Sequence, residues 1–157
     1  MSKKAKKIDI KLINKLREET GAPVIRVKKL LDELEGNETE ALEILKKEGF
    51  EKAAKRSERE TSQGIVATYI HHNQKLATMV ELLCETDFVS RNDLFIQLGK
   101  NLAMQLAFSE PKNVAEFEKQ EFIKDPSKTV LDLVKELIAK TGENVRIGKF
   151  YRLEIGK

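Results

Sequence analysis

The sequence has no tryptophan, one cysteine, two histidines and three prolines among 157 residues. A single thiol, Cys84, excludes an intramolecular disulfide and is typical of a reducing compartment, so we expect a cytoplasmic protein. The few prolines and eight glycines exclude collagen-like and low-complexity chains. No apolar run is long enough to cross a bilayer or to serve as a secretion signal. The length of 157 residues predicts one ordinary domain, or one domain with a small satellite.

Charged residues make up 35% of the chain and hydrophobic residues 40%, which favours a soluble, helix-rich protein. The net charge is only +3, and the excess lies within the first 62 residues. Most of it comes from a basic start that contains Lys3, Lys4, Lys6 and Lys7. Such a tail could contact phosphates, as in an RNA- or ribosome-associated protein, or could simply be solvated.

The residue types that carry catalysis or bind metals are scarce. His71 and His72 are adjacent, and neighbouring side chains of an extended segment point to opposite faces, so they cannot chelate one ion together. Cys84 lies in an apolar run and is expected to be a small core residue. The glycines are too scattered for a phosphate-binding loop. We therefore expect no metal, no cofactor and no enzymatic activity, and a binding protein becomes the leading hypothesis.

The first 50 residues predict a three-helix module. Apolar residues at helical spacing indicate a helix at 9–19, and Gly21 and Pro23 then suit a helix end and a new start. A second helix follows from Val24, and Asn37 with Glu40 predicts the start of a third. A charged stretch at 51–63 is expected to be a linker.

Residues 64–157 predict an α+β core domain. Two β-rich runs, 65–70 and 76–83, flank a short polar segment and indicate a hairpin. The remaining expected elements are a helix at 91–108, a surface connection with one short helical turn at 112–126, a helix from Val130 to Gly142, and a third strand at 145–155. The fold class is thus α+β with a small antiparallel sheet packed against helices.

The third strand is expected to alternate without interruption. One face would carry Val145, Ile147, Tyr151, Leu153 and Ile155, with Lys149 as an exception. The other face would carry Arg146, Phe150, Arg152 and Glu154.

The stretch from Glu85 to Asp93 lies where the strand pattern gives way to a helix pattern. Ser90 followed by Asp93 predicts an N-cap with a capping box, and Val89 with Leu94 predicts a hydrophobic staple around it. These local rules leave Phe88 and its neighbour Asp87 without a role. Phe88 is either tucked into the core or offered to a partner.

Residues Cys84–Asn92 closely resemble the signature of the bacterial elongation factor Ts family, Cys-Glu-Thr-Asp-Phe-Val-Ala-Arg-Asn, with Ser90 in place of alanine. Further matches run in the family's order and extend over nearly the whole chain. They are Leu16-Arg17, Thr20-Gly21-Ala22, Gly64-Ile65-Val66, Tyr69-Ile70-His71-His72-Asn73 and Gly142-Glu143-Asn144-Val145.

The resemblance implies a ubiquitin-associated-like module at 1–50, a linker at 51–63 and an exchange core at 64–157. It implies a guanine-nucleotide exchange factor that binds elongation factor Tu and promotes GDP release, with no direct contact to nucleic acid or membrane. By this resemblance Phe88 inserts into the GTPase domain near its magnesium site, and Thr86, Asp87 and Val89 belong to the same contact. The other contact residues that it implies are Arg17, Thr20, Gly21, Ala22, Pro23 and Val24 of the module and His71, His72, Asn73 and Arg146 of the core.

The chain departs from the family pattern at three places. Gly148-Lys149 replaces two frequent arginines, and Pro23-Val24-Ile25 is stiffer than the usual glycine followed by a flexible side chain. The span between Leu106 and Val130 has no room for the duplicated core half or the helical extension of long members. We therefore expect a homodimer that rebuilds the missing half, with the last strand in its interface, while the core sheet also touches the third domain of elongation factor Tu.

Overall fold

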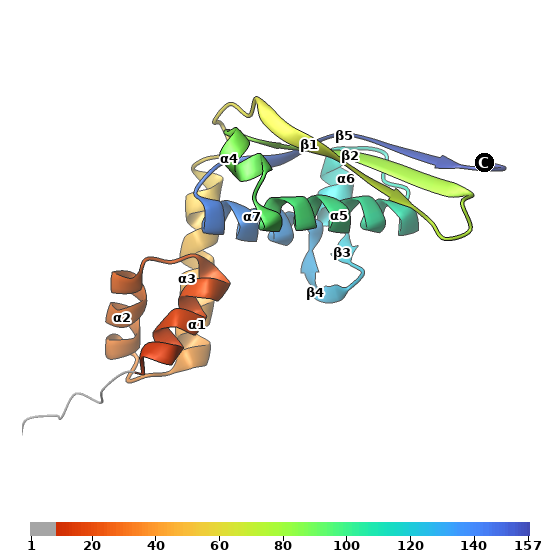
Figure 1. The fold of residues 1–157 in the computed structure, drawn as a ribbon. Coiled ribbons are helices and arrows are strands. Elements are labelled where there is room, and N and C mark those ends of the chain that lie inside the picture. Colours follow the sequence, from red (N-terminus) through yellow and green to blue (C-terminus); the bar gives the residue numbers. More distant parts are fainter. Residues whose placement is uncertain (1–8) are drawn as a thin grey trace, which may run out of the picture.

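The computed structural model describes residues 9–157. Its first three helices form a separate lobe, as the red and orange segments of Figure 1 show. They are α1 (Ile10–Thr20), α2 (Val24–Glu33) and α3 (Glu38–Ala54). The predicted boundaries are confirmed: Gly21 ends α1 at φ 69°, and the Asn37 side chain caps α3 by accepting from Glu40 N–H. The basic start at residues 3–7 lies outside the described residues.

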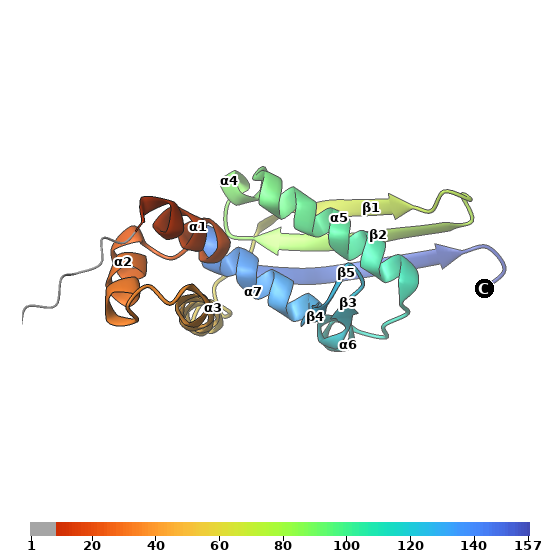
Figure 2. The ribbon, with the colours of Figure 1, turned by 90° about the horizontal axis from the view of Figure 1, so that it is seen from below.

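The core is built on a three-stranded antiparallel sheet in the order β1-β2-β5. Its strands are β1 (Gln63–Ile70), β2 (Leu76–Cys84) and β5 (Val145–Glu154). Two helices, α5 (Asp93–Phe108) and α7 (Val130–Thr141), run across one face of the sheet (Figure 2). Side chains from these helices and from the inner sheet face form one buried cluster that contains the fully buried Phe95, Leu102 and Val80. The predicted α+β class is confirmed.

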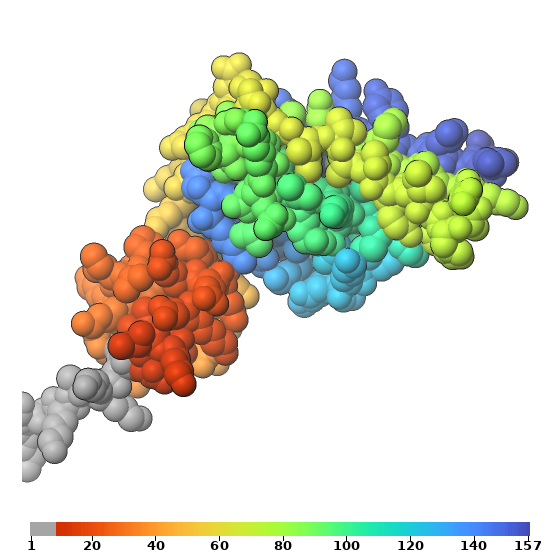
Figure 3. Space-filling model, in the orientation of Figure 1, coloured from red at the N-terminus to blue at the C-terminus, as the bar shows by residue number. Residues whose placement is uncertain are grey.

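The three-helix lobe and the core meet along α3 and the end of α7. The lobe has its own buried cluster, which includes Leu16 and Leu31, whereas Ala53 near the end of α3 belongs to the core cluster. Gly49 lets α3 approach α7, since a Cβ there would lie 3.1 Å from the Ala139 side chain. Figure 3 shows the lobe set against one end of the core. The division at residues 50 and 64 stays a prediction, with α3 continuing four residues past the first boundary.

The prediction of unbroken alternation in the last strand was wrong. Phe150 pairs with Val80 and Ile147 pairs with Leu82, so the two residues Gly148 and Lys149 face the single residue between them on β2. This β-bulge moves every later side chain to the opposite face. Phe150 therefore packs on the core with Val145 and Ile147, and its ring lies 5.5 Å from that of Phe117. Tyr151, Leu153 and Ile155 are exposed instead.

The segment expected to be a surface connection with one short helical turn has that turn but also an unpredicted hairpin. It contains α6 (Val114–Lys119) and a small hairpin of β3 (Glu121–Phe122) and β4 (Asp125–Thr129). Phe117 and Phe122 are buried, which ties the segment to the core. Its apolar residues are too sparse for a periodic signal, so the sequence pattern missed the hairpin. Among residues 9–157, no helix has the length and hydropathy that a bilayer crossing requires.

Candidate partner-binding site

Between β2 and α5 the chain forms one extra helical turn, α4 (Asp87–Ser90). The prediction that Ser90 caps the long helix was therefore wrong. Thr86 caps α4 by accepting from Val89 N–H, and Asn92 caps α5 by accepting from Leu94 N–H. Ser90 instead donates to the Asp87 carbonyl at 2.9 Å within α4. The predicted staple fails with it, because Val89 does not directly precede the actual cap, Asn92, and Leu94 is half exposed.

Phe88 points away from the core with 86% of its surface exposed. Its neighbour Val89 is buried, so the turn is anchored on one side and presents the aromatic ring on the other. Asp87 is also exposed and forms an ion pair with Arg91 at 3.2 Å, which contributes little in such an open setting. Of the two roles left open for Phe88, the structure excludes the core role.

The turn rests on a buried cysteine. The Cys84 thiol donates to the Thr86 carbonyl at 3.1 Å. Burial, reinforced by the negative charge of Glu143, raises the pKa of this thiol to about 11. A thiol that stays protonated is a poor nucleophile, which agrees with a structural role for Cys84.

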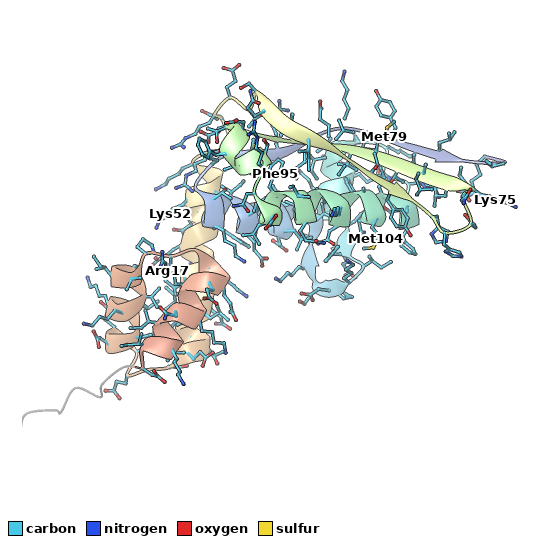
Figure 4. All side chains as sticks on the ribbon, viewed as in Figure 1. Arg17, Lys52, Lys75, Met79, Phe95 and Met104 are labelled. Carbon is cyan, nitrogen blue, oxygen red and sulfur yellow. The ribbon has the colours of Figure 1, made fainter. Side chains whose placement is uncertain are left out.

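The predicted contact residues of the module divide into exposed and inward-facing ones. Arg17, Pro23 and Val24 are exposed, and Figure 4 shows Arg17 on the module. Thr20 is buried, and its hydroxyl donates to the Leu16 carbonyl and accepts from Ala22 N–H. Gly21 faces α7, and Ala22 packs against the module's own core. The turn before α2 is therefore built by Thr20, Gly21 and Ala22, and it positions the exposed Pro23 and Val24.

Sequence reasoning did not single out Ile25, whose side chain is 82% exposed beside Val24. The signal was its position on the helix face opposite the buried residues of α2, which are Val27, Leu30 and Leu31. Pro23, Val24 and Ile25 form the exposed tip of the module. Beside it, a groove of about 240 Å³ is lined by residues of the module and of the end of α7. Its basic lining residues are Lys52, Arg56 and Lys140.

The remaining predicted residues lie elsewhere on the core. His71, His72 and Asn73 form the loop between β1 and β2, and Figure 4 shows Lys75 in this loop at the end of the sheet far from the module. The two imidazole rings lie 4.2 Å apart, so the expectation that they point to opposite faces was wrong. The reason is that they follow β1 in a turn. Within residues 9–157 there is no cluster of three acidic, histidine or cysteine side chains suited to a metal ion.

Arg146 lies at the opposite end of the sheet from that loop. Its side chain is exposed, and its Nε donates to the hydroxyl of the buried Thr61 at 2.6 Å. It thereby joins the start of β5 to the segment that enters β1.

A family model described as "Elongation factor TS" matches residues 85–157, which begin inside this signature turn. A relative from Oleidesulfovibrio alaskensis, named Elongation factor Ts, is 36% identical over 190 residues and aligns with 92% of this chain and 96% of its own length. The chain belongs to the elongation factor Ts family. Family members from Clostridium botulinum and Clostridium kluyveri are each 43% identical over 150 residues.

The chain spans about half the length of these Clostridium members, since the alignments cover 96% of this chain and 49% of theirs. The family model starts at Glu85 and so includes the α4 turn, the helices of the core and β5. Among the large hydrophobic side chains of this region the most exposed is Phe88, the aromatic of the elongation factor Ts signature.

Proposed function

We propose that this chain binds elongation factor Tu and promotes the release of its bound GDP. The observation that carries the proposal is Phe88, a large aromatic side chain that is 86% exposed on a turn built from the family signature. Exposing such a ring to water is unfavourable, and burial in a partner at the centre of an interface is worth about 2 kcal/mol or more.

The mechanism follows from linkage. A protein that binds the nucleotide-free GTPase more tightly than the GDP-bound form weakens nucleotide binding by the same factor. Each tenfold weakening requires about 1.4 kcal/mol of coupling. In our proposal Phe88 enters between helices of the GTPase domain near the magnesium site, and Asp87 makes polar contacts beside it. One buried ring is of the right size to contribute one such tenfold step, but a very large coupling needs further contacts.

The module tip provides the second contact with the GTPase domain in this proposal. Pro23, Val24 and Ile25 lie exposed at the start of α2, and Arg17 is exposed on α1. Support comes from the placement of both surfaces: α4 lies over the end of the sheet nearest the module in both ribbon views (Figures 1 and 2). In this proposal the third domain of elongation factor Tu contacts the remaining predicted residues of the core, which are His71, His72, Asn73 and Arg146.

Release of a fluorescent GDP from elongation factor Tu tests the proposal. Wild-type protein should accelerate release, Phe88→Ala should lose most of the acceleration, and Phe108→Ala should keep it. Phe108 is a matched control because it is an exposed phenylalanine, 60% accessible, at the far end of α5. Failure of the wild-type protein to accelerate release would overturn the function, and equal loss in the two variants would overturn the role of Phe88.

We also propose that two copies associate through the sheet face that the helices leave open. That face carries exposed apolar side chains from all three strands, namely Val66, Ile70, Met79, Tyr151 and Leu153. An uncovered apolar surface of this kind is typical of an interface, and the bulge in β5 turns Tyr151 and Leu153 onto it. A second copy would bury the patch against its own equivalent.

Light scattering at micromolar concentration tests the dimer. The wild-type mass should be twice that of one chain, and Tyr151→Glu should halve it because a buried carboxylate is costly. Ile25→Glu, on an apolar residue of the module that is even more exposed than Tyr151, should leave the mass unchanged. A monomeric wild-type protein would rule the dimer out. The cytoplasmic location follows from the same proposal, since translation takes place there.

A further inference from the structure

The turn that carries Phe88 cannot hold its own shape. Helix α4 has only four residues, fewer than a stable isolated helix requires by a wide margin. Phe88 makes almost no packing contact, and the Asp87–Arg91 pair is exposed. The direction in which Phe88 points therefore depends on the burial of Val89 and on contacts at the start of the turn.

Those contacts come from a segment 57 residues away in sequence. Both carboxylate oxygens of Glu143 bind Thr86: Oε2 accepts from the backbone N–H at 3.0 Å and Oε1 accepts from the hydroxyl at 2.6 Å. The same hydroxyl oxygen accepts from Val89 N–H as the cap of α4. The Glu143 carboxylate thus orients the hydroxyl so that its lone pair faces the helix.

Glu143 is itself held in place. It follows Gly142, which ends α7 at φ 79° with its N–H bound to the Ile138 carbonyl. It precedes Asn144, which is 2% exposed and whose side-chain amide donates to the carbonyls of Ser57 and Arg59.

A further hydrogen bond joins the same two segments, and here the loop after α7 is the donor. The backbone N–H of Asn144 donates to the Glu85 carboxylate at 2.6 Å. The consecutive residues Glu143 and Asn144 therefore bind the consecutive residues Thr86 and Glu85. Through these bonds the loop after α7 holds the start of the turn in place.

We propose that Glu143 is a positioning residue for nucleotide exchange, which rests on the function proposed above. It keeps the Thr86–Ser90 turn in the single geometry in which Phe88 can enter the partner. Without its two charge-assisted bonds the turn samples other shapes, and the fraction of molecules ready to insert Phe88 falls. Glu143 itself need not touch the GTPase.

Amide hydrogen exchange in the free protein tests the positioning without any partner. Glu143→Ala should speed exchange of the amides from Thr86 to Arg91, with the helix α7 amides unchanged. Glu116→Ala is the matched control, because Glu116 also accepts from a backbone N–H, that of Lys112 at 3.0 Å, in a different loop. Unchanged protection of the turn in Glu143→Ala would overturn the proposal whether or not the chain acts on a GTPase.

Release of fluorescent GDP then tests the consequence. Glu143→Ala should slow the stimulated rate about fivefold, while Glu143→Gln, which keeps one acceptor oxygen, should fall between it and wild type. Thr86→Ser should retain activity because it keeps the hydroxyl, and Thr86→Val should lose it. Adding Glu143→Ala to Thr86→Val should cost less than Glu143→Ala costs in the wild type, since the hydroxyl bond is already gone and only the bond to the backbone N–H of residue 86 is left to lose.

The outcomes separate the two proposals. Additive losses in the double variant, or loss of activity in Glu116→Ala equal to that in Glu143→Ala, would overturn the positioning role. A wild-type protein that leaves GDP release unchanged would overturn the proposed function, and the hydrogen-exchange result would still decide whether Glu143 holds the turn. Equal urea midpoints for wild type and Glu143→Ala would exclude general unfolding as the cause.

Discussion

Gly21 lies directly against Lys140: a Cβ on Gly21 would be only 2.7 Å from the Lys140 Cα and 2.8 Å from the Ala139 carbonyl oxygen. The turn between α1 and α2 therefore sits on the last turn of α7. Two residues beyond that helix, Glu143 binds Thr86 at the base of the Phe88 turn. One helix end thus sets the positions of both surfaces that we propose to face the partner.

Replacing Gly21 with alanine should disturb this docking. The left-handed φ of 69° alone costs about 1 kcal/mol for a residue with a Cβ, and the clash with backbone atoms adds to it. Gly36→Ala is the control, since Gly36 also has a positive φ, 87°, but nothing within 4 Å of its Cβ position. Urea unfolding should show a larger loss for Gly21→Ala. Equal losses would mean that α7 tolerates displacement of the turn.

The bulge in β5 predicts a small effect for Gly148→Ala. A Cβ there would meet the end of the Glu81 side chain, whose Oε2 accepts from Lys149 N–H at 3.0 Å. The flexible carboxylate can move away, so the cost should be that of one hydrogen bond, about 1 kcal/mol. In a Glu81→Ala background the substitution should cost almost nothing.

Gly64→Ala provides the contrast within the same sheet. Its Cβ would lie 2.2 Å from the Leu82 carbonyl oxygen, a backbone atom of the neighbouring strand. Relief requires β1 and β2 to separate, so thermal unfolding should show a clearly larger loss than for Gly148→Ala. A loss of the same size for both glycines would contradict this account.

The Cys84 thiol should be protected in the folded protein. Its pKa is raised to about 11 from an ordinary 9.0, chiefly by burial. At pH 8 a thiol reagent should therefore react at least about 100-fold more slowly with native protein than with protein unfolded in urea. The preference for the neutral thiol stabilises the fold fully below pH 9 and is lost as the pH rises through about 11. Rapid reaction of the native thiol would contradict the buried placement.

The pair of Arg26 and Glu48 should make the module sensitive to acid. Arg26 Nε donates to both carboxylate oxygens, at 3.1 and 3.0 Å, and these bonds lower the pKa of Glu48 below its ordinary 4.5. Because the pKa is lower in the folded state, the pair stabilises the module fully above that ordinary value and loses its effect as the pH falls through the folded-state pKa.

Thermal unfolding followed by circular dichroism between pH 6 and pH 3 measures this effect. Wild type should lose stability more steeply than Glu48→Gln as the pH falls. Glu43→Gln, on the exposed side of the same helix, should behave like wild type. Parallel pH profiles for wild type and Glu48→Gln would show that the pair contributes nothing to the acid response.

The sequence by itself determined most of the local structure and the family. Helix ends at Gly21, Asn37 and Gly142 follow from the conformational freedom of glycine and the capping of free N–H groups, which act over a few residues. The signature around Phe88 likewise lies in consecutive residues, so it could be found without coordinates.

Tertiary structure decided what depends on residues far apart in the chain. The bulge at Gly148 reverses which side chains of β5 face the core, and only the pairing with β2 reveals it. Thr86, the cap of the extra turn α4, is held by Glu143, 57 residues away, which binds both its hydroxyl and its amide. A pattern of neighbouring residues cannot predict such a contact, because the two segments that form it come together only when the chain folds.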